Sequence, residues 1–265
     1  MKIVSFFLLF FLFVGCGNKK SNVEITLIDK QTEENLKLLY KSMSLMEIEV
    51  VYEPDAEPYV GNRPNGQSYW TILESNIKEV FKQREGEYSL VVPTSLDQMT
   101  SIPAQNKSSW TSEDLQVLES KFRKTIPTGS QASVFVVFLK GNYNQDGVTN
   151  PNIIGVSLAG TTLIAIFKDV VESASAGSPQ SVAKFMEQST LVHEFGHVVG
   201  LVDNGLNMST PHIDEEHGHH CDNPNCVMFW KNEGKSNLIL FVQQIMTSGS
   251  TVMFDQNCLE DTKNY

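Results

Sequence analysis

Hydrophobic and polar positions recur along the chain with two periods, and these periods predict where strands and helices lie. Short apolar runs rich in branched and aromatic residues predict strands, over residues 45–52, 88–92, 133–139, 153–158 and 162–167. Apolar residues spaced three and four positions apart predict helices, over residues 69–84, 112–124, 179–200 and 238–246. A polar turn is expected at residues 141–151, and the segment 203–234, rich in His, Asn and Pro, predicts a long loop. This order of elements predicts an α+β fold.

The change from mixed strands and helices to a loop-rich region also predicts how the chain is divided. We expect an N-terminal subdomain over residues 24–202 and a C-terminal subdomain over residues 203–265, with a functional site where the two meet.

The first residues have the pattern of a targeting segment. Lys2 precedes an apolar run over residues 5–14, which is shorter than the roughly 20 apolar residues of a membrane-spanning helix. Residues 1–15 are therefore expected to be a secretory signal peptide. Gly15 before Cys16 resembles a bacterial lipobox, in which the cysteine is lipidated, and residues 16–23 would then be the anchor and tether. The alternative is an ordinary signal peptide with an incidental cysteine. We expect an exported protein, held by an N-terminal lipid on a periplasmic or cell-surface membrane face.

The net charge and the cysteines indicate which kinds of partner to expect and whether disulfide bonds can form. The net charge of −11 gives no indication of nucleic-acid binding. If Cys16 carries lipid, three cysteines are left, at positions 221, 226 and 258. Export allows disulfides, so a Cys221–Cys226 bond is predicted, with metal binding by the two thiolates as the alternative.

The helix predicted at 179–200 carries the sequence His-Glu-Phe-Gly-His at positions 193–197. Positions i and i+4 of a helix share one face, so His193 and His197 can direct two imidazoles to one metal ion. Glu194 can then reach a water on that metal without being a ligand, which is the arrangement of a zinc peptidase with a general base. A surface helix with two chance histidines is the alternative. Apolar neighbours argue against that alternative, and they are Leu191, Phe195, Val198 and Val199.

The motif continues as His-Glu-x-x-His-x-x-Gly-x-x-Asp, which resembles the metzincin clan of zinc endopeptidases. In that clan the glycine, here Gly200, lets the chain turn, and the third zinc ligand follows three residues later. The ligand is usually His and in some members Asp, so spacing alone assigns Asp203.

A second resemblance points to a different third ligand. His220-Cys221-x4-Cys226-x-Met228 is similar to the archaemetzincin branch, in which the third-ligand histidine directly precedes the first cysteine. This chain would then carry an insertion between Gly200 and His220. His220 is preferred as third ligand and Asp203 is the main alternative, while His212 and His217 stay open. The four-cysteine structural zinc site of archaemetzincins is incomplete here and is not expected.

The resemblance implies a metzincin-like fold with a twisted mixed sheet, an active-site helix and a loop-rich C-terminal subdomain. It implies one catalytic Zn²⁺, with Met228 as the Met-turn residue beneath the metal. The expected activity is that of a metalloendopeptidase, in which Glu194 activates a zinc-bound water against an extended peptide or protein substrate. The alternative is a non-catalytic zinc-binding surface lipoprotein that recognises a partner.

Overall fold

The computed structural model describes residues 22–265 and is built around one mixed sheet. Its strands run in the order β2-β1-β5-β9-β8, and β3 pairs with the C-terminal end of β1. The pairs are parallel except β8 with β9. The bounds are β1 (Leu45–Tyr52), β2 (Ser89–Val91), β3 (Thr100–Ser101), β5 (Gln131–Leu139), β8 (Gly155–Ser157) and β9 (Leu163–Phe167). The central strand β5 is almost continuously apolar and buried, as expected for a parallel strand covered on both faces.

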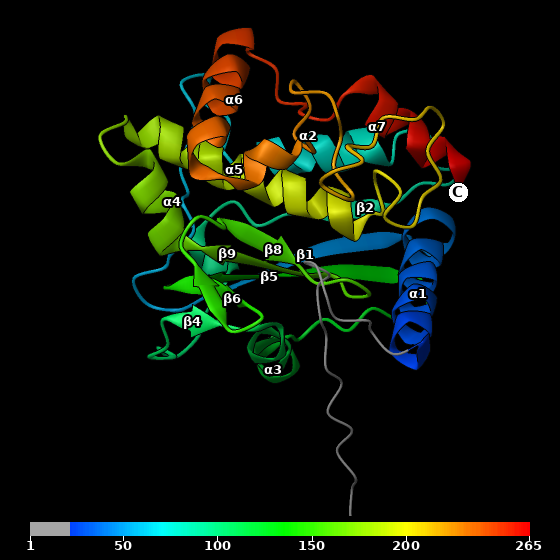
Figure 1. Ribbon diagram of the computed structural model, residues 1–265, viewed down its shortest axis with the longest axis horizontal. Coiled ribbons are helices and arrows are strands. Elements are labelled where there is room, and N and C mark those ends of the chain that lie inside the picture. Colours follow the sequence, from blue (N-terminus) through cyan, green and yellow to red (C-terminus); the bar gives the residue numbers. More distant parts are fainter. Residues whose placement is uncertain (1–21) are drawn as a thin grey trace, which may run out of the picture.

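Helices cover both faces of this sheet (Figure 1). The longest helix, α5 (Gln180–Val198), packs on β8 and β9 and contacts α2 (Thr71–Val80), α4 (Lys168–Ser175) and α6 (Lys235–Ser248). On the opposite face lies α3 (Ser112–Phe122), which begins with a capping box between Thr111 and Asp114. The prediction of a mixed sheet with helices is confirmed.

The strands and the four helices predicted from periodicity are present, with bounds that differ by a few residues. The polar turn at 141–151 contains a small hairpin, in which β6 (Asn142–Gln145) pairs with β7 (Val148–Asn150), and β4 (Ser109–Trp110) adds beside β6. The short 3-10 and π turns are η1 (Leu38–Ser42), η2 (Leu96–Gln98), η3 (Trp230–Glu233) and η4 (Thr262–Asn264).

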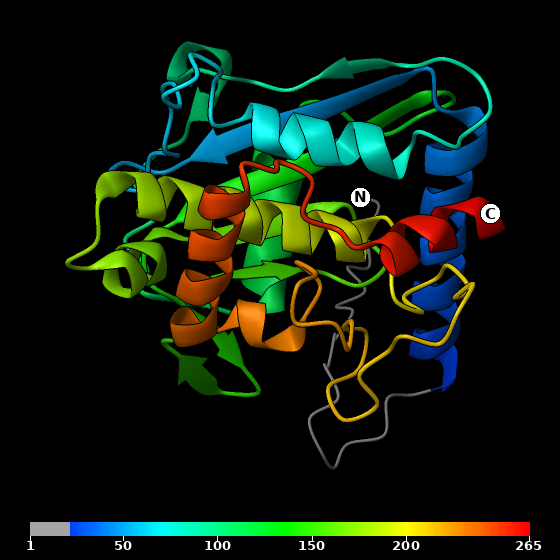
Figure 2. The same cartoon turned by 90° about the horizontal axis from the view of Figure 1, so that it is seen from above.

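Three helices were not predicted: α1 (Asn22–Lys37), α4 and α7 (Gln256–Asp261). Polar residues dominate α1, but Leu36 and, in the following turn, Leu39 and Tyr40 are buried. The predicted tether ends at residue 23, so its last two residues belong to α1. The C-terminal end of the chain lies beside α1 (Figure 2), where the Tyr265 hydroxyl donates to the Glu33 carbonyl.

Some predictions concern residues outside the described part of the chain. The signal peptide over residues 1–15, the lipidated Cys16 and most of the tether are among them. Within residues 22–265, no helix is both long and apolar enough to cross a membrane.

A buried ion pair joins α4 to α5. Lys168 and Glu187 have side chains that are 2% and 0% exposed, and they pair with each other. The second carboxylate oxygen of Glu187 accepts a hydrogen bond from the Tyr59 backbone N–H at 2.7 Å. The Lys168 ammonium also lies 3.3 Å from the centre of the Tyr59 ring. These contacts hold the middle of α5 against the start of α4 and against Tyr59.

Candidate metal centre

The last turns of α5 carry His193, Glu194 and His197 on the side that faces the C-terminal region. The two imidazoles lie together, with their Nε2 atoms 3.2 Å apart. The helix ends at Val198, and Gly200 has a φ of 85°, a left-handed conformation that favours glycine. The predicted turn at Gly200 is therefore present, and the chain leaves the helix directly after the motif.

The loop that follows α5 returns to the motif and brings in a third histidine. Seen from above, this loop lies between α1 and α6 (Figure 2). The ring of His220 lies 5.3 Å from that of His193 and 5.0 Å from that of His197, measured between ring centres. Glu233, at the end of η3, completes the group: its Oε1 is 2.9 Å from the His220 Nε2 and 3.6 Å from the His193 Nε2. One ligand atom of each of the four residues lies within 4.8 Å of the others.

Backbone carbonyls orient two of the three histidines. His193 Nδ1 donates to the Val227 carbonyl at 2.7 Å, and His220 Nδ1 donates to the His217 carbonyl at 2.8 Å. A proton on Nδ1 leaves Nε2 with a free lone pair, so both rings offer Nε2 to the centre of the group. Such a second hydrogen bond is the usual way in which proteins fix a metal-binding histidine.

The spacing of these atoms fits one zinc ion. Ligands about 2.0–2.1 Å from a tetrahedral zinc lie about 3.3 Å from each other. The observed separations of 3.2, 2.9 and 3.6 Å bracket that value. Nitrogen and carboxylate donors also match the ligands that zinc takes. The donor set and its geometry therefore fit a zinc centre.

The charges and the burial of the histidines and the nearby carboxylates favour a cation at the centre of the group. Burial, with help from the charges of His193 and His220, holds the pKa of His197 well below its ordinary value. Burial also opposes protonation of His193, but the contact with Glu233 and the charge of Glu194 raise its pKa. A divalent cation would satisfy the carboxylates and the imidazole lone pairs together.

Glu194 lies beside the histidines but outside the ligand group. It is 3% exposed, and burial raises its pKa to about 7, against the lowering effect of His193; Glu233 adds to the rise. A carboxyl group with a pKa near neutrality can accept a proton and return it at ordinary pH. Glu194 is therefore the candidate for proton exchange beside the histidines.

A cavity of about 540 Å³ opens in front of the group. Glu194, His197, His220 and Glu233 line it, together with all three residues of the edge strand β8. Strand β8 approaches α5 closely: a Cβ at Gly155 would lie 2.6 Å from the Thr190 side chain and 3.2 Å from that of Glu194. The cavity thus places an unpaired strand edge next to the candidate base.

Met228 packs beneath the motif and is fully buried. A Cβ at Gly196 would lie 2.3 Å from the Met228 Sδ, so the sulfur contacts the bare helix backbone at that glycine. Sequence reasoning missed Gly196 as a site residue. The signal was available, because a glycine inside a helix is unfavourable and often marks a close approach.

The other candidates for third ligand lie elsewhere. Asp203 is exposed, has a left-handed φ of 57° and is not among the residues that gather at the centre. His217 stacks on Trp230, with ring centres 3.6 Å apart. His212 is buried beside the cysteines. Glu233 belongs to the group although sequence reasoning did not propose it, and no motif spacing marks it.

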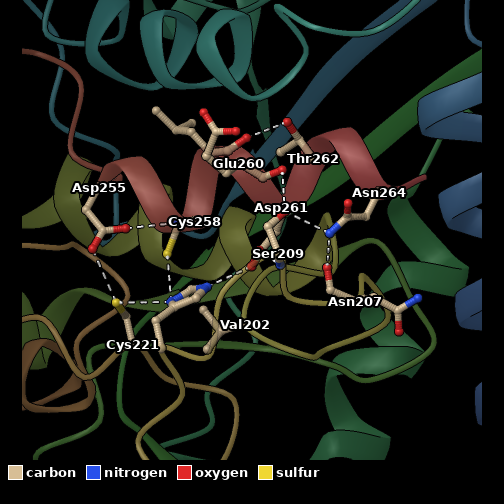
Figure 3. A network of polar contacts seen from close by, with 12 residues as sticks. Val202, Asn207, Ser209, Cys221, Asp255, Cys258, Glu260, Asp261, Thr262 and Asn264 are labelled. Carbon is tan, nitrogen blue, oxygen red and sulfur yellow. Dashed lines mark hydrogen bonds and ion pairs between the residues drawn. The ribbon is translucent and has the colours of Figure 1, made fainter.

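The predicted disulfide between Cys221 and Cys226 is absent, which corrects the prediction. Cys221, Cys226 and Cys258 are free thiols, and all three are buried. Their sulfurs and an Asp255 carboxylate oxygen lie within 4.8 Å of one another. Helix α7 supplies Cys258, which the sequence reading left without a partner (Figure 3). Thiolates and a carboxylate are ligands that zinc takes in proteins.

His212 adds a nitrogen to this second group. Its Nδ1 is 3.4 Å from the Cys221 sulfur and 4.0 Å from the Cys258 sulfur. On its other side, Nε2 donates to Asp261 at 2.8 Å. The carboxylate of Asp261 thereby directs the Nδ1 lone pair toward the thiols. Three thiols with this imidazole or with Asp255 could hold a structural metal.

No protein-family model matches the chain, and no curated protein matches it significantly. One solved structure that resembles it is a zinc-dependent peptidase from Methanocorpusculum labreanum (strain Z), with 11% identical residues and a TM-score of 0.44. The match covers 81% of this chain and 99% of the other.

Proposed function

We propose that this protein is a zinc-dependent peptidase of metzincin-like, archaemetzincin-like type. One observation carries the proposal: the imidazoles of His193, His197 and His220 converge beside the buried carboxyl of Glu194, in a cavity bordered by a free strand edge. A zinc ion bound there would polarise the scissile carbonyl and lower the pKa of a bound water toward about 7.

The residues of the chain have distinct tasks in this proposal. The three histidines hold the metal, and Met228 forms the apolar floor beneath His193 and His197. An extended peptide would lie along β8 and form backbone hydrogen bonds with its free edge. Glu194 would take the proton of the attacking water and deliver it to the leaving amine.

The test is digestion of a peptide library by zinc-loaded wild type and by Glu194→Gln, with zinc content measured for both. We expect cleavage by wild type, loss of cleavage in the variant and equal zinc content. An exposed glutamate that does not line the cavity provides a matched control, Glu85→Gln, which should retain activity. Zinc-loaded wild type that cleaves no peptide of the library would exclude the peptidase.

The competing proposal is a non-catalytic zinc-binding surface lipoprotein. The location of Glu194 favours the enzyme, since a site that only binds a partner does not require a base next to the metal. If wild type and Glu194→Gln bind zinc equally and retain the same protein partner without cleaving it, the binding function is the right one.

Export and anchoring are part of the proposal and rest on the first residues. The apolar run over residues 5–14 followed by Gly15 and Cys16 supports a lipoprotein signal. Cys16→Ser should move the protein from the membrane fraction to the soluble fraction and abolish incorporation of labelled fatty acid. Unchanged fractionation and labelling would exclude lipid anchoring at Cys16.

A further inference from the structure

Glu233 is the exposed member of the metal-binding group. Its side chain is 44% exposed, whereas that of His193 is 3% and that of His220 is 11% exposed. It also lines the cavity in which Glu194 and β8 lie. Its carboxylate therefore lies where the metal-binding group meets the cavity and solvent.

The Glu233 carboxylate faces the Nε2 atoms of His193 and His220. With Nδ1 of His193 and of His220 donating to backbone carbonyls, each neutral ring presents an Nε2 lone pair to the Glu233 carboxylate. Two acceptors 2.9 Å apart repel each other unless a cation lies between them. A proton on the imidazole can take that place in the metal-free protein. In the zinc-loaded protein the metal ion can take it, and the four atoms would then be its ligands, with Glu233 as the fourth.

A fourth protein ligand changes what the centre can do. Catalytic zinc sites have three protein ligands and an open position for water, whereas zinc sites with four protein ligands are closed. With Glu233 bound, the position for water is occupied. We propose that Glu233 is a removable fourth ligand, which closes the metal centre at rest and leaves when a peptide enters the cavity. This inference rests on the proposed peptidase function.

The local structure allows the carboxylate to leave without unfolding its surroundings. The preceding residue, Asn232, is buried, and its amide donates to the carbonyls of Cys226 at 3.0 Å and Val227 at 3.2 Å. The backbone of η3 is thus fixed beneath the site, next to the carbonyl that orients His193. Gly234 follows in an extended conformation. Rotation of the Glu233 side chain toward solvent is sufficient to open the centre.

Cobalt-substituted protein tests the proposal without any need for turnover. Co²⁺ in a site of this kind has visible absorption bands that report its ligands, and azide binds to an open position and shifts them. We expect the cobalt form of wild type to bind azide weakly and that of Glu233→Ala to bind it about tenfold more tightly or better, because removal of the carboxylate opens the site. Glu233→Ala should also weaken zinc binding about tenfold or more, in competition with a chromogenic chelator.

Two further variants control the experiment. Glu215→Gln removes an exposed acid from the loop that precedes η3 and should match wild type in azide and zinc binding. Glu233→Gln retains the size of the side chain and, as a weaker ligand, should fall between wild type and Glu233→Ala. Circular dichroism confirms that each variant is folded.

The outcomes separate this inference from the proposed function. Azide and zinc affinities of Glu233→Ala equal to those of Glu215→Gln would overturn the ligand role, whether or not peptides are cleaved. Loss of kcat with both affinities unchanged would also overturn it, since Glu233 would then act on protons. If Glu233→Ala opens the cobalt centre while no form of the protein cleaves peptides, the ligand role stands and the peptidase proposal fails.

Discussion

Replacing Lys168 by Met should destabilise the protein strongly, because it leaves Glu187 buried without its counter-ion. Removal of one partner of a buried ion pair costs about 3–5 kcal/mol. The Tyr59 backbone N–H still donates to Glu187 at 2.7 Å, and a hydrogen bond to a charged group is worth about 1.5–3 kcal/mol. We therefore expect the lower end of the range, about 3 kcal/mol. Since domains are stable by about 5–15 kcal/mol, the variant should still fold.

The measurement is the free energy of unfolding of zinc-saturated protein in urea at pH 8. Lys78→Met is the matched control, because Lys78 pairs with Glu74 on an exposed helix surface, where such pairs contribute about 0.3–0.5 kcal/mol. The double variant Lys168→Met/Glu187→Leu removes both charges and should recover most of the lost stability. A loss of less than about 1 kcal/mol in Lys168→Met would refute the reasoning, and so would a double variant as unstable as the single one.

The loss should depend on pH with a defined sign. Burial raises the pKa of Glu187, although the charge of Lys168 counteracts the rise. A carboxyl whose pKa is raised in the folded state contributes most stability below its unfolded pKa of about 4.3, and this is lost as pH rises through the folded value. Without Lys168 the folded pKa rises further. The difference between Lys168→Met and wild type should therefore be larger at pH 8 than at pH 5, and an equal difference at both would contradict this account.

Three further predictions concern the two metal-binding groups and the contact between Gly196 and Met228 beneath the first of them. His220→Ala should abolish tight zinc binding at the catalytic centre, measured by chelator competition, whereas Asp203→Ala should leave it unchanged; the reverse result would assign Asp203 as the third ligand. Gly196→Ala should lower the thermal midpoint, because its Cβ would lie 2.3 Å from the Met228 sulfur, and Gly196→Ala/Met228→Ala should recover part of the loss; no recovery would contradict this contact. Cys258→Ser should lower the zinc content by one ion per chain without loss of the catalytic zinc, and unchanged content would show that the thiol group holds no metal.

The sequence predicted the strands and the helix α5 because their burial is recorded in local periodicity. The apolar run of β5 and the spacing of Ile72, Leu73 and Ile77 in α2 each reflect a face that the fold covers. Helix α1 was missed because Leu36 is the one residue recorded as buried in the described part of the helix, and the residues before it, 29–35, are all polar. In this helix tertiary packing, rather than local pattern, decides the structure.

In the site, His193, Glu194 and His197 could be found from sequence because a helix fixes their relative positions. Glu233 could not, because its place depends on a 3-10 turn anchored by Asn232 far from the motif in sequence. The free cysteines were also misread. The place where the three thiols meet depends on α7, which brings the Cys258 sulfur to 3.5 Å from the Cys226 sulfur.

Which residue can be the third ligand depends on the path of the loop that leaves α5 and comes back to His193 and His197. After Gly200, both Val202 and Asp203 have left-handed φ angles, near 56° and 57°. This conformation is strained for a β-branched residue such as Val202, and full burial of that side chain offsets the strain. The reversal leaves Asp203 exposed, although the spacing to His197 matches the motif.

The loop comes back to the candidate metal centre at Cys221, the residue directly after His220, and contacts of Cys221 fix the loop there. Its backbone N–H donates to the Met228 carbonyl at 2.8 Å, and its thiol belongs to the second metal-binding group. A metal bound by the three thiols would thus fix Cys221, and with it the position of the His220 imidazole at the catalytic centre. Through one peptide bond, a metal in the cysteine group would support the candidate metal centre, so that a long loop could still place His220 accurately.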